Sequence, residues 1–507
     1  MRASSAFVKR WRLAGAAGAV ALAWGWGAWA QNPMAAGPFA AAVVAAEGPF
    51  GAPPYDDPAS VLGMPSTDFY DPWGGLFGGT TMRRVKLVEP AHDFDPSQTR
   101  KLVTTLGEGS LIIVRFEQPI TDDPAHPYGL DLLVFGNAWF ASSGFADDSA
   151  DMNTLMLIGG GFAEPMKVSV SPGCTGKPGE DAADWRTWAW YCYENGPYAD
   201  TAFPTHAYRW NRADSTWSRE GMDFTKPVNP VLGPMFESGG LSAADAIDLY
   251  AGSGGGTGFD LAESGFALVH YVKVEGQAGF DGGEIDAFSC VRPTVLGDSL
   301  CLAPANGNVG SVFHFQEPGN PARNVVRLEL SALAGIVVAG VARFEDPSAL
   351  AALPCRRFEA VDFKVAGVLG SDVPTFDAAL VINVGPWYVG GGADLDALAW
   401  DGASWTRMPF EFDAGAGTVR LAGLGAGGAF AVVQISPPRL AIQAAGTGFG
   451  FQFLPVGGWR HTLERTVDCG SWSSVASLTP TNGEPVALSD AAPLGTRAWY
   501  RLRLTRP

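Results

Sequence analysis

The sequence has few charged residues and few histidines, and this scarcity excludes several classes of function. Charged residues make up 17% of the 507-residue chain, with 34 lysines and arginines against 52 aspartates and glutamates. The net charge of −18 opposes nucleic-acid binding, because neutralising phosphates needs a basic surface. The six histidines are scattered singly, and neither G-x-S-x-G nor H-E-x-x-H occurs. The acidity suits an exported soluble protein or a cation-binding one.

Helical periodicity is scarce, and the one long apolar run lies at the N-terminus. Residues 13–30 carry no charge, follow four basic residues and end in Ala28-Trp29-Ala30. This pattern predicts a secretory signal peptide over residues 1–30, with a membrane anchor as the alternative. Its removal would leave a still more acidic mature chain in which we expect no transmembrane helix. The expected location is therefore extracellular or at the cell surface.

The six cysteines include no C-x-x-C pair and fit an oxidising compartment. Two pairs each bracket one short loop, and closing such loops is easy. We therefore predict the disulfides Cys174–Cys192 and Cys290–Cys301, each adding ~3 kcal/mol of stability. The pairing of Cys355 and Cys469 is left open.

Short apolar runs separated by Gly, Pro, Asp and Asn predict an all-β fold. The clearest are residues 110–116 and 130–135, two buried strands joined by a polar loop. One short helix is expected at 243–250, capped by Ser242. The whole pattern favours tandem β-sandwiches. The expected organisation is a signal peptide (1–30), a linker (31–50), a first domain (51–304) with a Trp-rich insertion (172–260), a second β-sandwich (305–436) and a small C-terminal domain (437–507).

Several segments of the first domain resemble a known family. They lie at 57–65, 106–110, 129–137, 167–171, 258–262, 271–274 and 284–288. In order and spread they are similar to bacterial exported cell-surface proteins with a jelly-roll, galactose-binding-like domain. One departure is Gly136, where the family usually has glutamate. The segments 461–465 and 497–502 resemble immunoglobulin or fibronectin type III-like modules, which implies such a fold for the C-terminal domain.

The first resemblance implies a structural calcium ion. Galactose-binding-like sandwiches often hold one ion between an early loop and the last strand, and Ca²⁺ takes six to eight oxygen ligands. Asp56 and Asp57 lie in the early loop, while Glu284 and Asp286 lie on the expected closing strand. We predict these four acids as the ligands. The alternative is that they cap turns and cover the surface.

Aromatic side chains crowd the insertion and form the best candidate for a ligand surface. Flat rings stack on sugars, and a loop held by a disulfide would avoid the cost of ordering on binding. The opposing interpretation is that these rings form a small core for the insertion. The candidate binding residues are Trp185, Trp188, Trp190, Tyr191 and Tyr193.

These features predict a non-catalytic binding or structural protein that adheres to glycan or matrix. An extracellular polysaccharide hydrolase is the alternative, since paired acids such as Asp122 and Asp123 can cleave glycosides at a suitable separation. A purely structural envelope component is a third option. The literal G-x-G-x-x-G at 423–428 precedes an expected strand, not a helix, so it is interpreted as a hairpin turn and not a phosphate site. The oligomeric state is not defined by the sequence.

Overall fold

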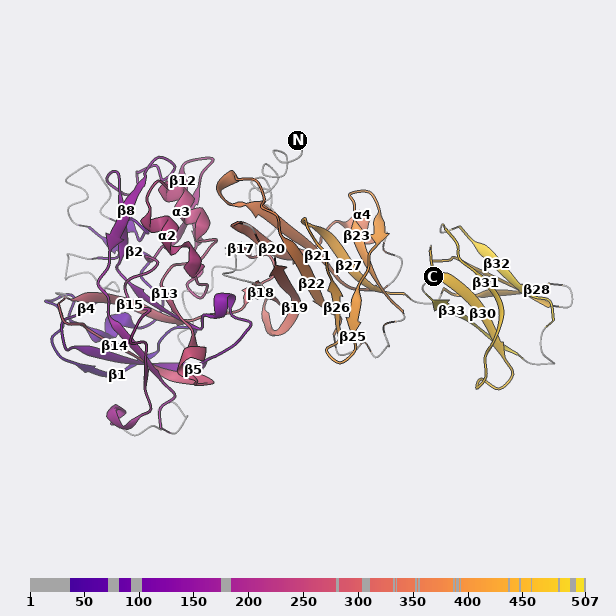
Figure 1. The fold of residues 1–507 in the computed structure, drawn as a ribbon, viewed down its shortest axis with the longest axis horizontal. Helices are drawn as coiled ribbons and strands as arrows, with labels where there is room; N and C mark the ends of the chain where they lie inside the picture. Colours follow the sequence, from indigo (N-terminus) through magenta and orange to yellow (C-terminus); the bar gives the residue numbers. More distant parts are fainter. Residues whose placement is uncertain are drawn as a thin grey trace. The chain divides into compact units, whose positions relative to one another are not determined.

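Strands dominate the structure, a computed structural model, and confirm the predicted all-β class (Figure 1). Its described residues form two compact units: the first reaches Pro321 and includes Ser331–Gly340 and Val365–Phe376, and the second holds the rest. The predicted signal peptide lies outside the described residues. These are 37–71, 82–92, 103–174, 184–279, 282–302, 311–331, 333, 335–351, 353, 356–385, 388, 392, 394–435, 438–445, 448–456, 458–481, 484–492 and 498–505.

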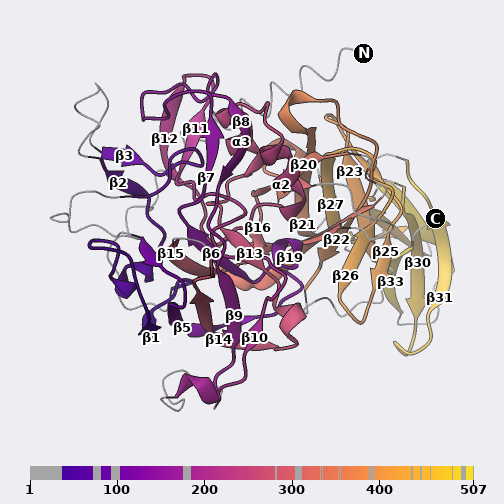
Figure 2. The ribbon, with the colours of Figure 1, turned by 60° about the vertical axis from the view of Figure 1, so that its left-hand side comes forward.

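The first unit is built on two antiparallel sheets. One has the order β1-β5-β14-β9-β10, and Figure 2 shows β5, β14, β9 and β10 side by side. The other has the order β13-β6-β15-β4. Their strands are β1 (Ala42–Glu47), β5 (Leu111–Thr121), β14 (Leu268–Glu275), β9 (Lys167–Ser171), β10 (Tyr191–Cys192), β13 (Thr257–Phe259), β6 (Leu132–Gly136), β15 (Gly283–Cys290) and β4 (Thr104–Leu106).

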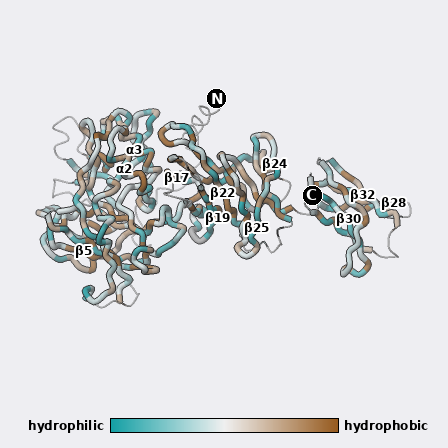
Figure 3. The backbone as a smooth tube through the Cα atoms, in the orientation of Figure 1, coloured by the Kyte–Doolittle hydropathy of each residue, from teal (hydrophilic) through white to brown (hydrophobic). Residues whose placement is uncertain are grey.

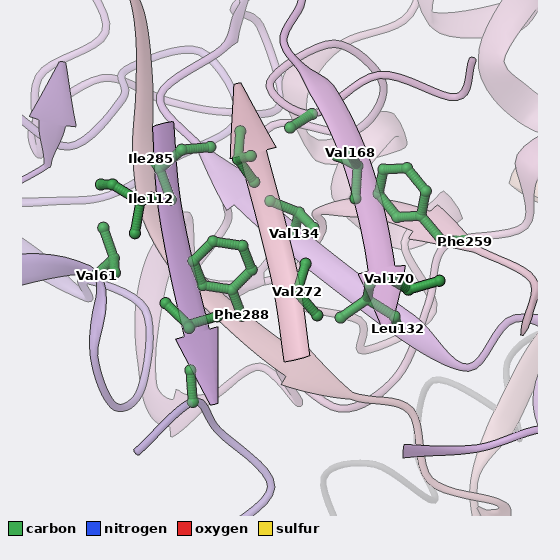
Figure 4. Close-up of a cluster of buried hydrophobic side chains, with 14 of the residues drawn as sticks. Val61, Ile112, Leu132, Val134, Val168, Val170, Phe259, Val272, Ile285 and Phe288 are labelled. Carbon is green, nitrogen blue, oxygen red and sulfur yellow. The ribbon is translucent and has the colours of Figure 1, made fainter. Parts of the chain in front are cut away.

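One hydrophobic core lies between these two sheets. Alternate residues of β5 and β14 point into it, including Ile112 and Val272, and meet Val134 and Phe288 from the other sheet (Figure 4). Side chains alternate across a strand, so the remaining residues of each strand face outward. Such sheet-on-sheet packing is sandwich-like. Burying each aliphatic or aromatic side chain of this kind contributes about 1.5–3 kcal/mol.

Both sheets are also covered on their outer faces, which explains why their strands are continuous apolar runs. Ile113 and Tyr271 face away from the central core and pack with Trp188. Leu133 and Phe135 of β6 face away on the other side and pack with Phe224. The Trp-rich insertion thus supplies a second layer to each sheet.

The predicted linker at 31–50 is wrong for residues 42–47, which form β1 at the edge of the five-stranded sheet. β1 pairs antiparallel with β5, from Ala42 opposite Arg115 to Glu47 opposite Leu111. Small and β-branched residues, AVVAAE, fill this strand. The alanine-rich composition was a poor guide here, because backbone hydrogen bonds to β5 hold this segment as a strand.

Short hairpins and helices complete the first unit. The expected helix is α3 (Ala243–Leu249), which begins with the capping box of Ser242 and Asp245. The other elements are β2 (Asp68–Tyr70) with β3 (Met82–Arg84), β7 (Trp139–Ser142) with β8 (Leu157–Phe162), β11 (Tyr208–Asn211) with β12 (Thr216–Gly221), α2 (Gly233–Glu237), η3 (Pro58–Val61), η5 (Pro127–Gly129), η6 (Trp185–Thr187), η7 (Pro230–Leu232), η8 (Leu261–Ser264) and η9 (Val368–Gly370).

Two further strand pairs belong to the first unit. β16 (Thr294–Val295) pairs parallel with β18 (Ser311–Glu317), and β17 (Ser299–Leu302) pairs antiparallel with β20 (Val337–Arg343). The strands β19 (Asn320–Ser331), β20 and β21 (Arg356–Gly367) run through the division between the units.

The second unit contains strands from the predicted second and C-terminal domains. Its strand runs are β22-β26-β25, β21-β27-β23-β24, β28-β29-β32 and β31-β30-β33. The bounds are β22 (Asp377–Asn383), β26 (Thr418–Leu421), β25 (Glu411–Asp413), β27 (Gly428–Gln434), β23 (Leu395–Trp400), β24 (Trp405–Arg407), β28 (Ala441–Ala445), β29 (Gly448–Phe453), β32 (Val486–Asp490), β31 (Ser473–Leu478), β30 (Arg460–Thr466), β33 (Trp499–Thr505) and the helix α4 (Pro347–Ala351).

The glycine-rich segment at 423–428 leads from one strand to another, as expected from its sequence. It follows β26 and precedes β27, and these strands lie in different sheets. It is therefore a connection between sheets and not the hairpin turn that we predicted. A helix N-terminus, which a dinucleotide phosphate site needs, does not follow it.

In the part of the chain that the structure describes, the apolar residues occur in short stretches. Figure 3 shows brown and teal segments alternating along the strands. Among the described residues, no helix combines the length and apolar character needed to cross a membrane.

Candidate functional site

The five predicted aromatic residues do not share one surface. Tyr193 is 1% exposed and belongs to the central core, where its ring meets Phe259 at 5.0 Å and its hydroxyl donates to the Asp260 carbonyl. Burial raises the pKa of Tyr193 well above its usual range. Tyr191 packs edge-on against Tyr193 at 5.0 Å. These two tyrosines therefore serve mainly as core residues.

Trp188 is also a structural residue, because it covers Ile113 and Tyr271 on the outer face of the five-stranded sheet. It is 7% exposed, and its ring lies 4.2 Å from that of Tyr271 on β14. Trp190 stacks on it with centroids 6.0 Å apart. Trp188 is thus a buried packing residue, as the opposing interpretation held, but it packs on the sheet and not in a core of the insertion itself.

Trp185 and Trp190 remain half-buried, and we call this pair the aromatic platform. Their rings meet edge to face at 6.4 Å, and the Trp190 Nε1 donates to the Trp185 carbonyl at 2.9 Å. The Lys273 Nζ lies 5.3 Å from the Trp190 centroid, and Arg186 lies over Trp185 at 4.4 Å. These contacts fix the orientation of the rings.

The charges around the aromatic platform are balanced. Arg186 pairs with Glu47 of β1 at 2.6 Å, and Lys273 pairs with Glu275 of β14 at 2.8 Å. These pairs are partly solvent-exposed, so each contributes little to stability. They place positively and negatively charged side chains, all able to form hydrogen bonds, beside the rings.

The structure does not bring the four predicted calcium ligands together. Asp56 is exposed, and exposed Asp57 caps η3 by accepting from the Ala59 amide. Asp286 is fully buried, and its two oxygens accept from the amide and hydroxyl of Ser66 at 2.7 and 2.9 Å. Glu284 lies instead beside two acids that we did not predict, Glu164 and Asp200.

Neither predicted disulfide is present, because Cys192, Cys290 and Cys301 are free cysteines. Cys290 ends β15, whereas buried Cys301 lies on β17, which pairs with β20 in another sheet. Burial raises the pKa of the Cys301 thiol to about 12. The Cys192 thiol interacts with Ser169 and Glu194. Short sequence separation therefore did not place either pair together.

Cys469 is an exposed free cysteine, and Cys355 lies outside the described residues.

The most perturbed histidine is His206, which is fully buried. Its Nδ1 accepts from the Leu87 amide at 3.4 Å, and its ring lies 5.9 Å from that of Tyr250. Burial, helped by the nearby Lys86 ammonium, lowers the pKa of His206 to about 3. The side chain is therefore neutral and enclosed, which suits a structural role.

We expect His206 to make the first unit acid-sensitive. Its folded pKa lies below the ordinary 6.5, so the unfolded chain takes up the proton first and stability falls as the pH drops from about 6.5 towards 3. Urea unfolding of the wild type and of His206→Gln should diverge by about 4 kcal/mol between about pH 7 and pH 3. Parallel stability curves for the two proteins would contradict this assignment.

No protein-family model matches the chain, and no curated protein matches it.

Proposed function

We propose that the protein is an exported, non-catalytic binding protein that adheres to glycan or matrix through Trp185 and Trp190. The observation that carries this proposal is that both rings remain half-buried where they pack against the apolar cluster of Ile113, Trp188 and Tyr271 on the five-stranded sheet. Stacking on a sugar ring needs a flat apolar surface with polar groups at its rim. The aromatic platform supplies two partly exposed rings, and the Arg186 and Lys273 side chains that lie over them supply charged groups.

The platform is also held in place before any ligand arrives. Trp188 anchors Trp190 to Tyr271, and the indole of Trp190 is tied to the backbone of Trp185. Such preorganisation lowers the entropic cost of binding. The aromatic platform therefore does not need the predicted Cys174–Cys192 disulfide to be rigid, because its rings are held by packing on β14.

The acids favour a binding protein over the alternative hydrolase. Glycoside cleavage needs two carboxyl groups that reach the substrate. Asp123 of the predicted pair accepts from the Ala125 amide and so shapes its own turn. The nearby Asp131 is 1% exposed and accepts from His126 and Leu261 at 2.6 and 2.8 Å. These carboxylates hold loops of the fold.

A glycan array probed with the purified chain tests the proposal. We expect binding to one class of glycan, and Trp190→Ala should weaken it about five- to tenfold, since one aromatic contact contributes about 1–1.5 kcal/mol. Trp499→Ala is the matched control, because Trp499 is 48% exposed in the second unit.

Two results would overturn the proposal. One is the absence of any binding above background, which would favour a purely structural envelope component. The other is equal loss of binding in both tryptophan variants, which would place the ligand elsewhere. Circular dichroism of each variant separates lost binding from lost folding.

A further inference from the structure

Three acids from distant segments converge in the first unit. Glu164 precedes β9, Asp200 lies in the Trp-rich insertion, and Glu284 lies on β15. Each offers one carboxylate oxygen, and these oxygens all lie within 4.8 Å of one another. The backbone also joins two of the segments, because the Glu164 amide donates to the Asp200 carbonyl at 3.3 Å.

Asp200 is enclosed at the centre of this group. It is 2% exposed, and its Oδ1 accepts from the Ala138 amide at 2.6 Å. Its Oδ2 is buried and has no hydrogen-bond partner among the described residues. A buried carboxylate oxygen without a partner costs free energy, so such an atom in a folded protein calls for a proton, a water molecule or an ion to offset that cost.

The backbone of β6 is adapted to hold this carboxylate. A Cβ at Gly136 would lie 2.1 Å from the Asp200 Oδ1 and 2.5 Å from its Cγ. Glycine at position 136 therefore leaves the space that the carboxylate fills. The hydroxyl of Thr105 on β4 donates to the Glu284 Oε1 at 3.0 Å and so helps to fix the position of this carboxylate.

The three acids are not neutralised by the basic side chains nearby. None of the ion pairs within the described part of the chain includes them; Lys167 pairs with Glu194 and Lys273 with Glu275. Three carboxylates with oxygens this close together repel one another, so a shared proton or a bound cation must offset that repulsion.

We propose that Glu164, Asp200 and Glu284 bind a calcium ion. The donors are all oxygens, which favours a hard cation over zinc or copper. Three convergent carboxylates suit Ca²⁺, whereas Mg²⁺ is usually held by one or two carboxylates and keeps several waters. Backbone carbonyls or water would complete the coordination shell.

A second group of three acids in the first unit has no buried carboxylate oxygen without a hydrogen-bond partner among the described residues. Asp122, Asp131 and Asp260 also bring one oxygen each within 4.8 Å. Both oxygens of its buried member, Asp131, already accept hydrogen bonds, from His126 and Leu261. The unpartnered oxygen of Asp200 thus distinguishes the proposed site from an ordinary acidic cluster.

Thermal unfolding of the EDTA-treated full chain, with CaCl₂ or MgCl₂ added back, tests this site. Extracellular calcium modules bind with a Kd of about 10⁻⁴–10⁻³ M, so about 10 mM CaCl₂ should raise the Tm of the first unit by about 3–8 °C. The same concentration of MgCl₂ should have a smaller effect. Asp200→Asn should abolish the calcium response, and Glu164→Gln is the second variant if Asp200→Asn fails to fold.

The Tm in EDTA separates an ion ligand from a merely structural aspartate. An amide at position 200 removes repulsion from Glu164 and Glu284, so Asp200→Asn should be at least as stable as the wild type without calcium. A purely structural role would lower the Tm with and without the ion. Asp56→Asn is the control of equal charge change at an exposed position, and it should keep the full response.

Three outcomes would overturn the proposal: no calcium response in the wild type, an undiminished response in Asp200→Asn and Glu164→Gln, or a larger response to magnesium. The inference is independent of the carbohydrate proposal, because it is read from Tm and not from glycan binding. Each can fail while the other stands.

Discussion

Gly136→Ala should destabilise the first unit by about 3 kcal/mol or more, at the upper end of what overpacking costs. The new methyl carbon would lie 2.1 Å from the Asp200 Oδ1 and 2.6 Å from the Glu284 carbonyl oxygen. Neither neighbour can move easily, because Asp200 is 2% exposed and the carbonyl belongs to β15. The chain must therefore separate β6 from β15 or expel the carboxylate.

Urea unfolding measures this effect, with Gly233→Ala as the control. A Cβ at Gly233, also in the first unit, would meet no atom within 4 Å. Adding Asp200→Ala to Gly136→Ala should restore part of the lost stability, since only the contact with the Glu284 carbonyl would remain. Equal urea midpoints for Gly136→Ala and the wild type would show that the close packing at this position is not rigid.

Trp459→Ala should cost about 3–5 kcal/mol in the second unit, the range expected for removing a large buried aromatic residue. Trp459 is fully buried just before β30, and its Nε1 donates to the Asp396 Oδ2 at 3.0 Å. Arg407 lies over the ring at 4.9 Å and pairs with the same carboxylate at 2.7 Å. The ring packs among Ala360, Leu398, Ala431, Val433 and Ile435.

A conservative change separates the two contributions of Trp459. Trp459→Phe keeps most of the packing but leaves Asp396 with one donor fewer, so it should cost less, about 1–3 kcal/mol. Calorimetry of both variants, with exposed Trp499→Ala expected within about 0.5 kcal/mol of the wild type, gives the comparison. Similar losses in all three would contradict a specific anchoring role for Trp459.

Local signals predicted much of the fold. The capping box of Ser242 and Asp245 begins α3 where the sequence indicates it, because its hydrogen bonds span only three residues. The apolar runs of β5 and β6 became strands because both of their faces are covered. By contrast, β1 depends on a partner strand some seventy residues away, so its composition alone resembled a linker.

The sites were harder to predict because they depend on the path of the chain in space. Glu284 was identified, but its neighbours Glu164 and Asp200 come from segments with no shared motif. The one available signal was Gly136, a glycine in an otherwise apolar strand. The absence of a side chain there leaves room for a group from elsewhere, and the Asp200 carboxylate fills that room. The two disulfide predictions were wrong for the same reason, because a short separation in sequence does not guarantee a short distance in space.

The position of β14 also determines when the first unit can form. This strand lies between β5 and β9, and Tyr271 pairs with Arg115 on one side and Ser171 on the other. The central strand is thus made after the entire Trp-rich insertion, so β5 must wait for a late partner. Folds with such distant pairings close slowly. A chain emerging N-terminus first would therefore leave one edge of β5 unpaired until β14 has been synthesised, a period in which a chaperone would have its greatest effect.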